Sequence, residues 1–172
     1  MLETLITSKT RIRILVKFFI NAANNGHLRG LAEEMNESTN SIRKELNNLT
    51  EAGYLSKEAN QNRVNYKANK KHPLFETLQK IVFQHLGLDA IVDMILARMG
   101  KVNQIIILGD YANGIDSGTI EVMIVGKQLN LNYIDQLAFK IEAEIKRKII
   151  FTTAIINVEK GLIIYEDFTI IN

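Results

Sequence analysis

The stretch from Leu28 to Leu55, LRGLAEEMNESTNSIRKELNNLTEAGYL, constrains the fold most, because it holds two helical apolar patterns separated by a short break. Its first part has apolar residues at i, i+3, i+4 and i+7, which predicts a helix over Arg29–Met35. The break is Asn36-Glu37-Ser38, and Ser38 is a suitable N-cap for a second helix that Gly53 would end. The apolar residues of the two patterns are Leu28, Leu31, Ala32 and Met35, then Ile42, Leu46, Leu49 and Ala52.

This spacing is that of a helix-turn-helix, and the second helix has a polar face opposite its leucines. Side chains of these types donate hydrogen bonds to phosphates or to base edges. An ordinary solvated helix face also carries amides and charges, and for this stretch alone the two interpretations are equally supported. The face comprises Asn40, Lys44, Asn47 and Asn48, flanked by Ser41 and Arg43.

The charge distribution separates the two halves of the chain. The net charge is +2, but residues 1–72 hold 12 Lys/Arg against 7 Asp/Glu, whereas residues 73–172 hold 9 against 12. The basic half is the one with the helix-turn-helix pattern. A polyanionic partner is therefore expected for that half only.

Composition bounds the remaining possibilities. With 172 residues and 47% apolar content, the chain can form one ordinary domain or two small ones. It has no cysteine, so disulfides, thiolate metal sites and cysteine nucleophiles are excluded. No segment has the pattern of a signal peptide or reaches the ~20 apolar residues of a membrane span, so we expect a cytoplasmic protein without a membrane partner.

The segments on either side of the two helices have patterns of their own. Ser8 would cap a helix running to about Ala23 with two apolar stripes, one of which would pack on a later helix or on a second subunit. His27-Leu28 could form a short strand. Beyond Gly53, Tyr54–Lys57 and Arg63–Ala68 are candidate strands joined by the polar loop 58–62.

This order of elements resembles the winged helix-turn-helix transcriptional regulators, in particular the ArsR-like branch. The resemblance covers about half of the chain and rests on the cadence "LA…S…S…L…L…AGYL". It implies that the helix 38–52 enters the major groove and that the wing 54–68 lies on the DNA backbone, with its tip at 60–63. A solvated hairpin without a partner is the alternative for the wing. The DNA-contacting residues would be Ser38, Thr39, Asn40, Ser41, Arg43, Lys44, Asn47 and Asn48 on the helix, and Lys57, Asn62, Arg63 and Lys67 on the wing.

The histidines argue against a metal-sensing member of that branch, since His27, His72 and His85 are widely spaced. Pro73 fits the first turn of a helix with a broad apolar face up to Gly87. In ArsR-like proteins a helix in this place pairs with the first helix to form a homodimer. Bridging of two domains and simple core packing remain alternatives for it.

From Leu88 onward, helices alternate with buried strands, which predicts an α/β domain. The expected elements are a helix at 88–99, a strand at 104–108, an irregular segment at 109–114, a strand at 119–125, a long helix at 131–145, a strand at 149–158 and an edge strand at 162–171.

The segment ILGDYANGIDSGTIEVMIV resembles the nucleotidyltransferase motif, in which a strand ends in Gly-Ser and the next strand carries Asp-x-Asp. The Gly-Ser backbone would cradle phosphates, and the carboxylates would hold divalent metal ions. Gly109 matches, but Asp110 replaces the serine, Thr119 takes the first carboxylate position and Glu121 the second. The strand 149–158 offers no third acid before its end. We therefore expect the scaffold without the enzyme, and no cofactor or metal.

Three smaller interpretations accompany this one. Asp116 is an alternative ligand beside Glu121, although Asp116-Ser117-Gly118 also has ordinary turn chemistry. Asp110 and Asp116 together could bind a cationic group of an effector or a protein partner. Positive charge at Lys146-Arg147-Lys148 would complement the end of a helix rather than form a second nucleic-acid patch.

The expected architecture is an α+β winged helix-turn-helix (1–72), a linker or dimerisation helix (73–87), and an α/β nucleotidyltransferase-like domain with a small mixed sheet (88–172). The expected function is that of a transcriptional regulator that binds double-stranded DNA as a homodimer. The alternatives are an active nucleotidyltransferase recruited by its helix-turn-helix and a protein–protein adaptor that does not bind DNA.

Overall fold

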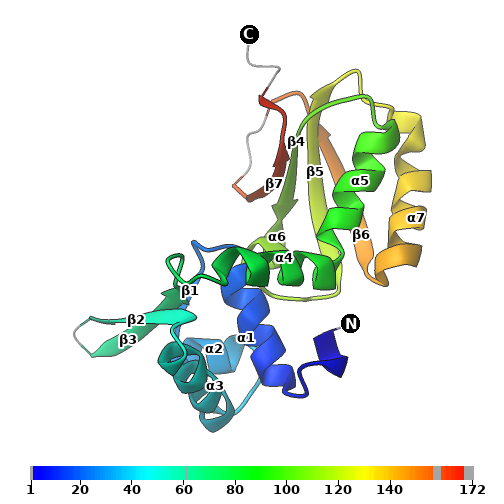
Figure 1. The fold of residues 1–172 in the computed structure, drawn as a ribbon. Helices are drawn as coiled ribbons and strands as arrows, with labels where there is room; N and C mark the ends of the chain where they lie inside the picture. Colours follow the sequence, from blue (N-terminus) through cyan, green and yellow to red (C-terminus); the bar gives the residue numbers. More distant parts are fainter. Residues whose placement is uncertain (1, 61, 157–159, 169–172) are drawn as a thin grey trace. The chain divides into compact units, whose positions relative to one another are not determined.

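The computed structural model describes residues 2–60, 62–156 and 160–168, and it is an α+β fold with a three-stranded and a four-stranded sheet (Figure 1). Its contacts divide it into two compact units. One unit contains residues 1–85 with 113–115, and the other contains residues 86–112 with 116–172. The described residues include no helix that is long and apolar enough to cross a membrane.

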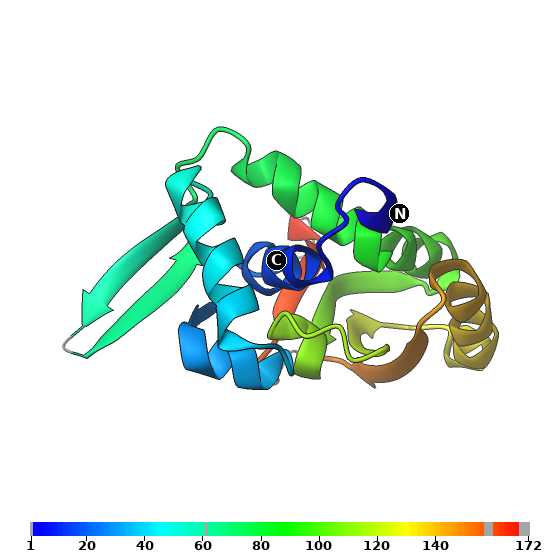
Figure 2. The same ribbon diagram turned by 90° about the horizontal axis from the view of Figure 1, so that it is seen from below.

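The N-terminal unit consists of five helical segments and a three-stranded sheet. The sheet has the order β1-β3-β2, and both pairings are antiparallel. The helix α3 runs beside the base of the hairpin formed by β2 and β3 (Figure 2). In chain order the elements are η1 (Leu2–Thr4), α1 (Lys9–Phe19), β1 (Asn25–His27), α2 (Leu28–Glu34), α3 (Thr39–Glu51), β2 (Leu55–Asn60), β3 (Arg63–Ala68) and α4 (Phe75–Leu86).

The capping residues explain where these helices begin and end. The hydroxyls of Ser8 and Ser38 accept the backbone N–H groups of Arg11 and Ser41, which fixes the first turns of α1 and α3. After α3, Gly53 adopts φ +80° and the N–H of Tyr54 donates to the carbonyl of Leu49, as in a Schellman ending. Both serine caps and the glycine stop are as the sequence predicts.

The prediction of the first helix was too long, because α1 ends at Phe19 rather than near Ala23. The side-chain amide of Asn24 donates to the carbonyl of Lys17 at 2.9 Å, and this contact satisfies a carbonyl of the last helical turn. Both apolar stripes of α1 are nevertheless buried within one chain, since Ile14 and Phe18 are fully covered. The ring of Phe19 lies 5.7 Å from that of Phe75 in α4, so the later helix does contact the first.

The hairpin is longer than predicted. Residues 58–60, expected in the loop, belong to β2 and pair with β3 up to Asn60 and Arg63, and position 61 of the predicted loop lies outside the described residues. The polar residues Glu58 and Asn60 suggested a loop, but in an exposed hairpin neither face needs apolar side chains, and backbone pairing is sufficient. The short strand before α2 is Asn25–His27, whereas Leu28 already belongs to the helix.

The C-terminal unit is a four-stranded sheet of order β6-β5-β4-β7 with helices on one face. The strand β4 is antiparallel to β5 and β7, and β5 is parallel to β6, so the sheet is mixed as expected. Its elements are α5 (Leu88–Arg98), β4 (Lys101–Leu108), α6 (Gly109–Ala112), β5 (Thr119–Lys127), η2 (Leu131–Tyr133), α7 (Ile134–Ile145), β6 (Lys148–Ala154) and β7 (Leu162–Glu166).

Side-chain alternation divides this sheet into two different faces. On one face, Ile105, Ile107 and Val122 are fully buried. The helices α5 and α7 lie together on one side of the sheet (Figure 2). The opposite face has a small buried cluster of Ile106, Met123 and Val125.

Several predicted boundaries in this unit were wrong. The strand β4 begins three residues earlier than expected, and 109–112 form a short helix instead of an irregular segment. The strand β5 runs to Lys127 rather than to position 125, β6 ends at Ala154, and β7 ends at Glu166. The last residues of the two expected C-terminal strands, 157–158 and 169–171, lie outside the described residues.

Candidate nucleic-acid interface

The outward surface of α3 presents most of the residues expected to touch DNA. We call this surface the outer face of α3. Its members are all exposed, while Ile42, Leu46 and Leu49 are buried on the other side of the same helix. The outer face of α3 consists of Thr39, Asn40, Arg43, Lys44, Asn47 and Asn48.

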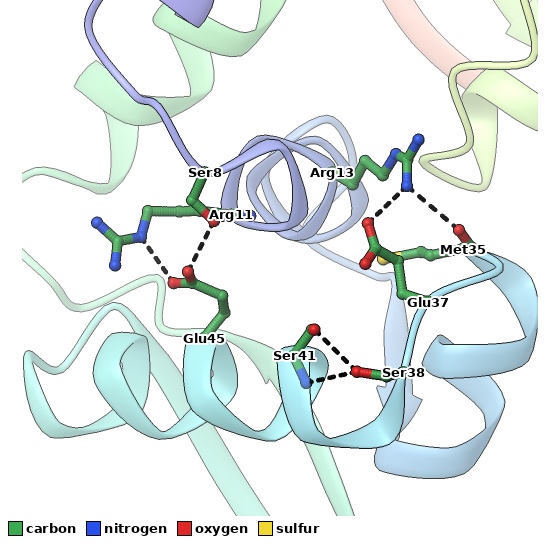
Figure 3. Close-up of polar contacts among 8 residues, drawn as sticks. All are labelled: Ser8, Arg11, Arg13, Met35, Glu37, Ser38, Ser41 and Glu45. Carbon is green, nitrogen blue, oxygen red and sulfur yellow. Dashed lines mark hydrogen bonds and ion pairs between the residues drawn. The ribbon is translucent and has the colours of Figure 1, made fainter.

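Two of the predicted contact residues have a structural task at the start of α3. The Ser38 hydroxyl accepts the N–H of Ser41 at 3.1 Å, and the two serine hydroxyls lie 2.8 Å apart (Figure 3). Each hydroxyl therefore has a partner within the helix. Ser38 and Ser41 thus hold the helix start, and the outer face of α3 begins beside them.

Basic residues of α1 neutralise acids that lie behind this surface. Arg11 Nε donates to Glu45 Oε2 at 2.7 Å, and the Ser8 hydroxyl donates to Glu45 Oε1 at 2.8 Å. Arg13 binds Glu37 at 2.7 Å and also donates to the carbonyl of Met35 (Figure 3).

A third pair joins Lys17 to Glu34 at 2.8 Å. Glu45 is almost completely buried although it belongs to α3, with 7% of its side chain exposed. These three ion pairs were not foreseen from the sequence, because the partners lie 17 to 34 residues apart.

These ion pairs change how charge is distributed over residues 1–72, which the net charge alone does not show. Within the described residues, four of the seven acids of residues 1–72 are paired with Lys or Arg: Glu34, Glu37, Glu45 and Glu58. Arg43 and Lys44 on the outer face of α3 have no such acid partner in that part of the chain. Arg43 donates only to Asn40 Oδ1, at 3.3 Å. The outer face of α3 therefore keeps the positive charges of Arg43 and Lys44.

The three cations predicted for the hairpin do not lie on the same face of it. In the β2–β3 register, Lys57 lies opposite Tyr66 and Ser56 lies opposite Lys67, so Lys57 is on one face while Lys67 and Arg63 are on the other. Lys67 also forms an ion pair with Glu58. Lys57 and Arg63 have no acid partner among the described residues, and of these two Arg63 lies at the hairpin end, where it begins β3.

A cavity of about 660 Å³ lies between α2, α3 and the hairpin. It brings Arg29 and Arg43 to the same hollow as Arg63, with Asn62 near the hairpin end. His27 also lines it, and neither His27 nor Arg29 was among the predicted contact residues. In the sequence, no pattern distinguishes His27-Leu28-Arg29 from an ordinary solvated segment. The sequence therefore does not predict that these residues line a cavity.

The nucleotidyltransferase-like segment keeps only part of its expected geometry. Gly109 has φ +58°, and a Cβ atom on it would lie 2.5 Å from Glu121 Oε1, so the Glu121 carboxylate lies against the Gly109 backbone. Asp110 is exposed on α6, and Thr119 pairs with Lys148 in the sheet. The structure thus brings together Gly109 and Glu121 from this set.

Asp116 is held by a different pair of side chains. Arg147 donates to both of its carboxylate oxygens, at 3.1 and 2.7 Å, and the hydroxyl of the buried Tyr111 donates to Oδ1. Arg147 also donates to the carbonyl of Ile145 at 3.3 Å, so it satisfies the end of α7 as its position in the sequence indicated. Asp116 is therefore a structural acid rather than an open ligand beside Glu121.

The surroundings of this cluster shift two pKa values. Burial, followed by the hydrogen bond to Asp116, raises the pKa of the Tyr111 hydroxyl. The hydrogen bond to Asp116 raises the pKa of the Arg147 guanidinium. Both shifts favour the protonated forms, which keeps the cluster intact at neutral pH.

In residues 2–60, 62–156 and 160–168, no three His, Cys, Asp or Glu side chains are placed to share a metal ion. No protein-family model matches the chain, and the searches of curated proteins and of solved structures gave no match.

Proposed function

We propose that this protein is a DNA-binding transcriptional regulator whose N-terminal unit is a winged helix-turn-helix. The observation that carries the proposal is the outer face of α3, where amides, Arg43 and Lys44 are exposed while the acids behind them are paired with α1. Amide and guanidinium groups donate to base edges and phosphates, so α3 suits the major groove. The β2–β3 hairpin would act as the wing beside it.

The proposed regulator works as a dimer, with the half-sites of its operator about one helical turn apart, ~10 bp. The helix α4 is the candidate for the dimer contact, since Leu74 is exposed just before it and Phe75 and Leu78 are only half-buried. The C-terminal unit would then serve as a sensor or interaction domain that binds an effector or a protein partner.

The direct test is selection of bound duplexes from a random DNA library, followed by measurements of affinity across a salt series. We expect Lys44→Ala to weaken binding of the selected duplex and to reduce the slope of log K against log salt by about 1, without unfolding the protein. Lys127→Ala, in the C-terminal unit, is the matched control. Equal affinity and equal slope for wild type and Lys44→Ala would contradict the assignment of this face. No enriched sequence and no salt dependence would favour an adaptor that binds protein instead.

A second function is favoured by one observation, the Glu121 carboxylate against the left-handed Gly109. That arrangement would be retained in a working nucleotidyltransferase recruited by the winged domain. Incubation with labelled nucleotides and Mg²⁺ or Mn²⁺ distinguishes the two functions. Sustained label transfer that disappears in Glu121→Ala would replace the regulator with an enzyme, whereas a regulator transfers no label.

A further inference from the structure

We propose that the cavity between α2, α3 and the hairpin binds a phosphate group, held between the His27 imidazole and the Arg63 guanidinium. We call it the His27–Arg63 cavity. The phosphate can come from a DNA backbone or from a small phosphorylated ligand, and both present the same tetrahedral anion. The version with DNA rests on the proposed function, whereas the version with a small ligand does not.

The hydrogen bonds of His27 carry this inference. The N–H of Gly30 donates to His27 Nδ1 at 2.9 Å, so Nδ1 is an acceptor and has no proton. A neutral imidazole has one N–H, which must therefore be on Nε2. Arg63 Nη1 lies 3.4 Å from that same Nε2.

A guanidinium has only donors, so this contact places two N–H donors side by side without an acceptor between them. An oxygen of an anion seated beside both groups would accept from each of them. This arrangement is what a site for a phosphate oxygen requires.

The backbone fixes the imidazole in this position. A Cβ atom at position 30 would lie 2.5 Å from His27 Cε1 and 2.6 Å from Nδ1, so only glycine leaves room for the ring. The His27 side chain is the cap of α2, and the pairing of His27 with Asn65 in the sheet fixes its backbone. The Nε2 donor is thus directed by the fold before any ligand binds.

The charges around the cavity favour an anion. Arg29 and Arg43 line it with Arg63, and none of the three has an ion-pair partner among the described residues. Glu33 is the one acid among the lining residues, against three arginines. Guanidinium groups bind phosphate oxygens in a bidentate manner, so the three arginines make this cavity suitable for an anion.

The size of the cavity is compatible with both sources. About 660 Å³ exceeds what one phosphate fills and falls in the range of small-molecule sites. Tyr66, which is half-buried, is also among the lining residues.

The first experiment titrates the full chain with inorganic phosphate and follows the His27 ring by long-range ¹H–¹⁵N NMR. We expect Nδ1 to remain the unprotonated nitrogen and the Nε2–H resonance to shift in a saturable way. The variants are Arg63→Gln, which removes the charge, and His27→Asn, which retains an acceptor to cap α2. Lys127→Ala, exposed in the C-terminal unit, is the control. Arg63→Gln should abolish the shift of the His27 ring, and for His27→Asn, followed through the amide of Gly30, saturation should also disappear. Thermal unfolding confirms that each variant is folded.

The result that overturns the proposal is a His27 ring that phosphate does not shift, or a shift of equal size in Arg63→Gln and wild type. A proton found on Nδ1 in the free protein would overturn it as well, because the two donors would then no longer face each other.

The second experiment identifies the source of the phosphate with a DNA duplex and with ATP as the small phosphorylated probe. If a backbone phosphate occupies the cavity, ATP competes with the duplex, and His27→Asn, at a residue outside the predicted DNA contacts, loses at least about tenfold in DNA affinity. If a small ligand is the source, ATP binds without displacing the duplex, and His27→Asn leaves DNA affinity unchanged. Saturable phosphate binding without any DNA binding would support the cavity and remove the proposed function. DNA binding by a protein whose His27 ring is shifted by neither inorganic phosphate nor ATP would remove only the cavity.

Discussion

The two units each contain an arginine–carboxylate pair between distant segments, and the pairs have opposite effects on the surface. In the N-terminal unit, Arg11 forms an ion pair with Glu45 on the inner side of α3, and the outer face of α3 keeps its positive charge. In the C-terminal unit, Arg147 forms an ion pair with Asp116, which the sequence suggested as an alternative metal ligand. The same contact thus leaves one surface available to a polyanion and closes another to a cation. What a surface can bind therefore depends more on where an acid is neutralised within a unit than on the net charge of that unit.

The largest effect should come from the buried side of α3. Leu46 is 1% exposed, and Leu46→Ala should lower the free energy of unfolding by ~2–5 kcal/mol because it leaves a cavity. Urea denaturation measures the change, with Lys44→Ala as the control on the outer face. A cost for Leu46→Ala no larger than that for Lys44→Ala would mean that the two sides of α3 are not distinct.

The next effect tests the pair in the N-terminal unit. Glu45→Ala should cost about 1–3 kcal/mol, because the hydroxyl of Ser8 and the guanidinium of Arg11 both lose a charged acceptor. Glu37→Ala is the matched control, and its cost should be about 0–1 kcal/mol because Arg13 is half exposed. Both are measured by denaturant unfolding. Equal costs would show that burial of Glu45 contributes nothing.

The pair in the C-terminal unit should have a smaller effect. Asp116→Asn should cost about 1–2 kcal/mol, since Arg147 loses its ion pair and the buried Tyr111 hydroxyl loses a charged acceptor. Asp110→Asn, exposed on α6, should stay within about 0.5 kcal/mol of wild type. If the two substitutions cost the same, Asp116 is not the structural acid that its contacts indicate.

The smallest effect is a dependence on alkaline pH. Burial and the contact with Asp116 raise the pKa of Tyr111 above its ordinary value of 10.0. The folded protein therefore holds this proton where the unfolded chain releases it. The stabilisation is complete below pH 10 and decreases as the pH rises through the folded-state pKa. Unfolding free energies measured from pH 9 to 11 should fall less steeply for Tyr111→Phe. Parallel curves would contradict the shift.

The sequence predicted those parts of the fold that depend on local chemistry. Ser8, Ser38 and Gly53 act within one or two turns of their own positions, and all three have the expected roles. The β2 strand was misjudged at Glu58 and Asn60, because backbone pairing in an exposed hairpin leaves no apolar pattern. The start of β4 was missed for a related reason, since polar Lys101 and Asn103 precede its apolar run.

The candidate site could be predicted only in part. The outer face of α3 follows from helical periodicity, so the sequence alone predicts its residues. The opposite faces of Lys57 and Arg63 depend on strand register, and the engagement of Asp116 depends on an arginine 31 residues away. Such pairings are set by how segments pack, which neither spacing nor composition encodes.

The strand β1 has a consequence for the cost of ordering the hairpin. An isolated two-stranded ribbon is marginal in water, but here Asn25–His27 pairs with β3 and makes it the middle strand of three. The side chain of Asn65 also donates to Asn25 at 3.2 Å. The chain thus loses the conformational entropy of the hairpin during folding and not when a partner arrives. A partner that binds beside Asn65 and Lys67 therefore meets a strand that is already paired on both sides, and less of its binding free energy is consumed in ordering that strand.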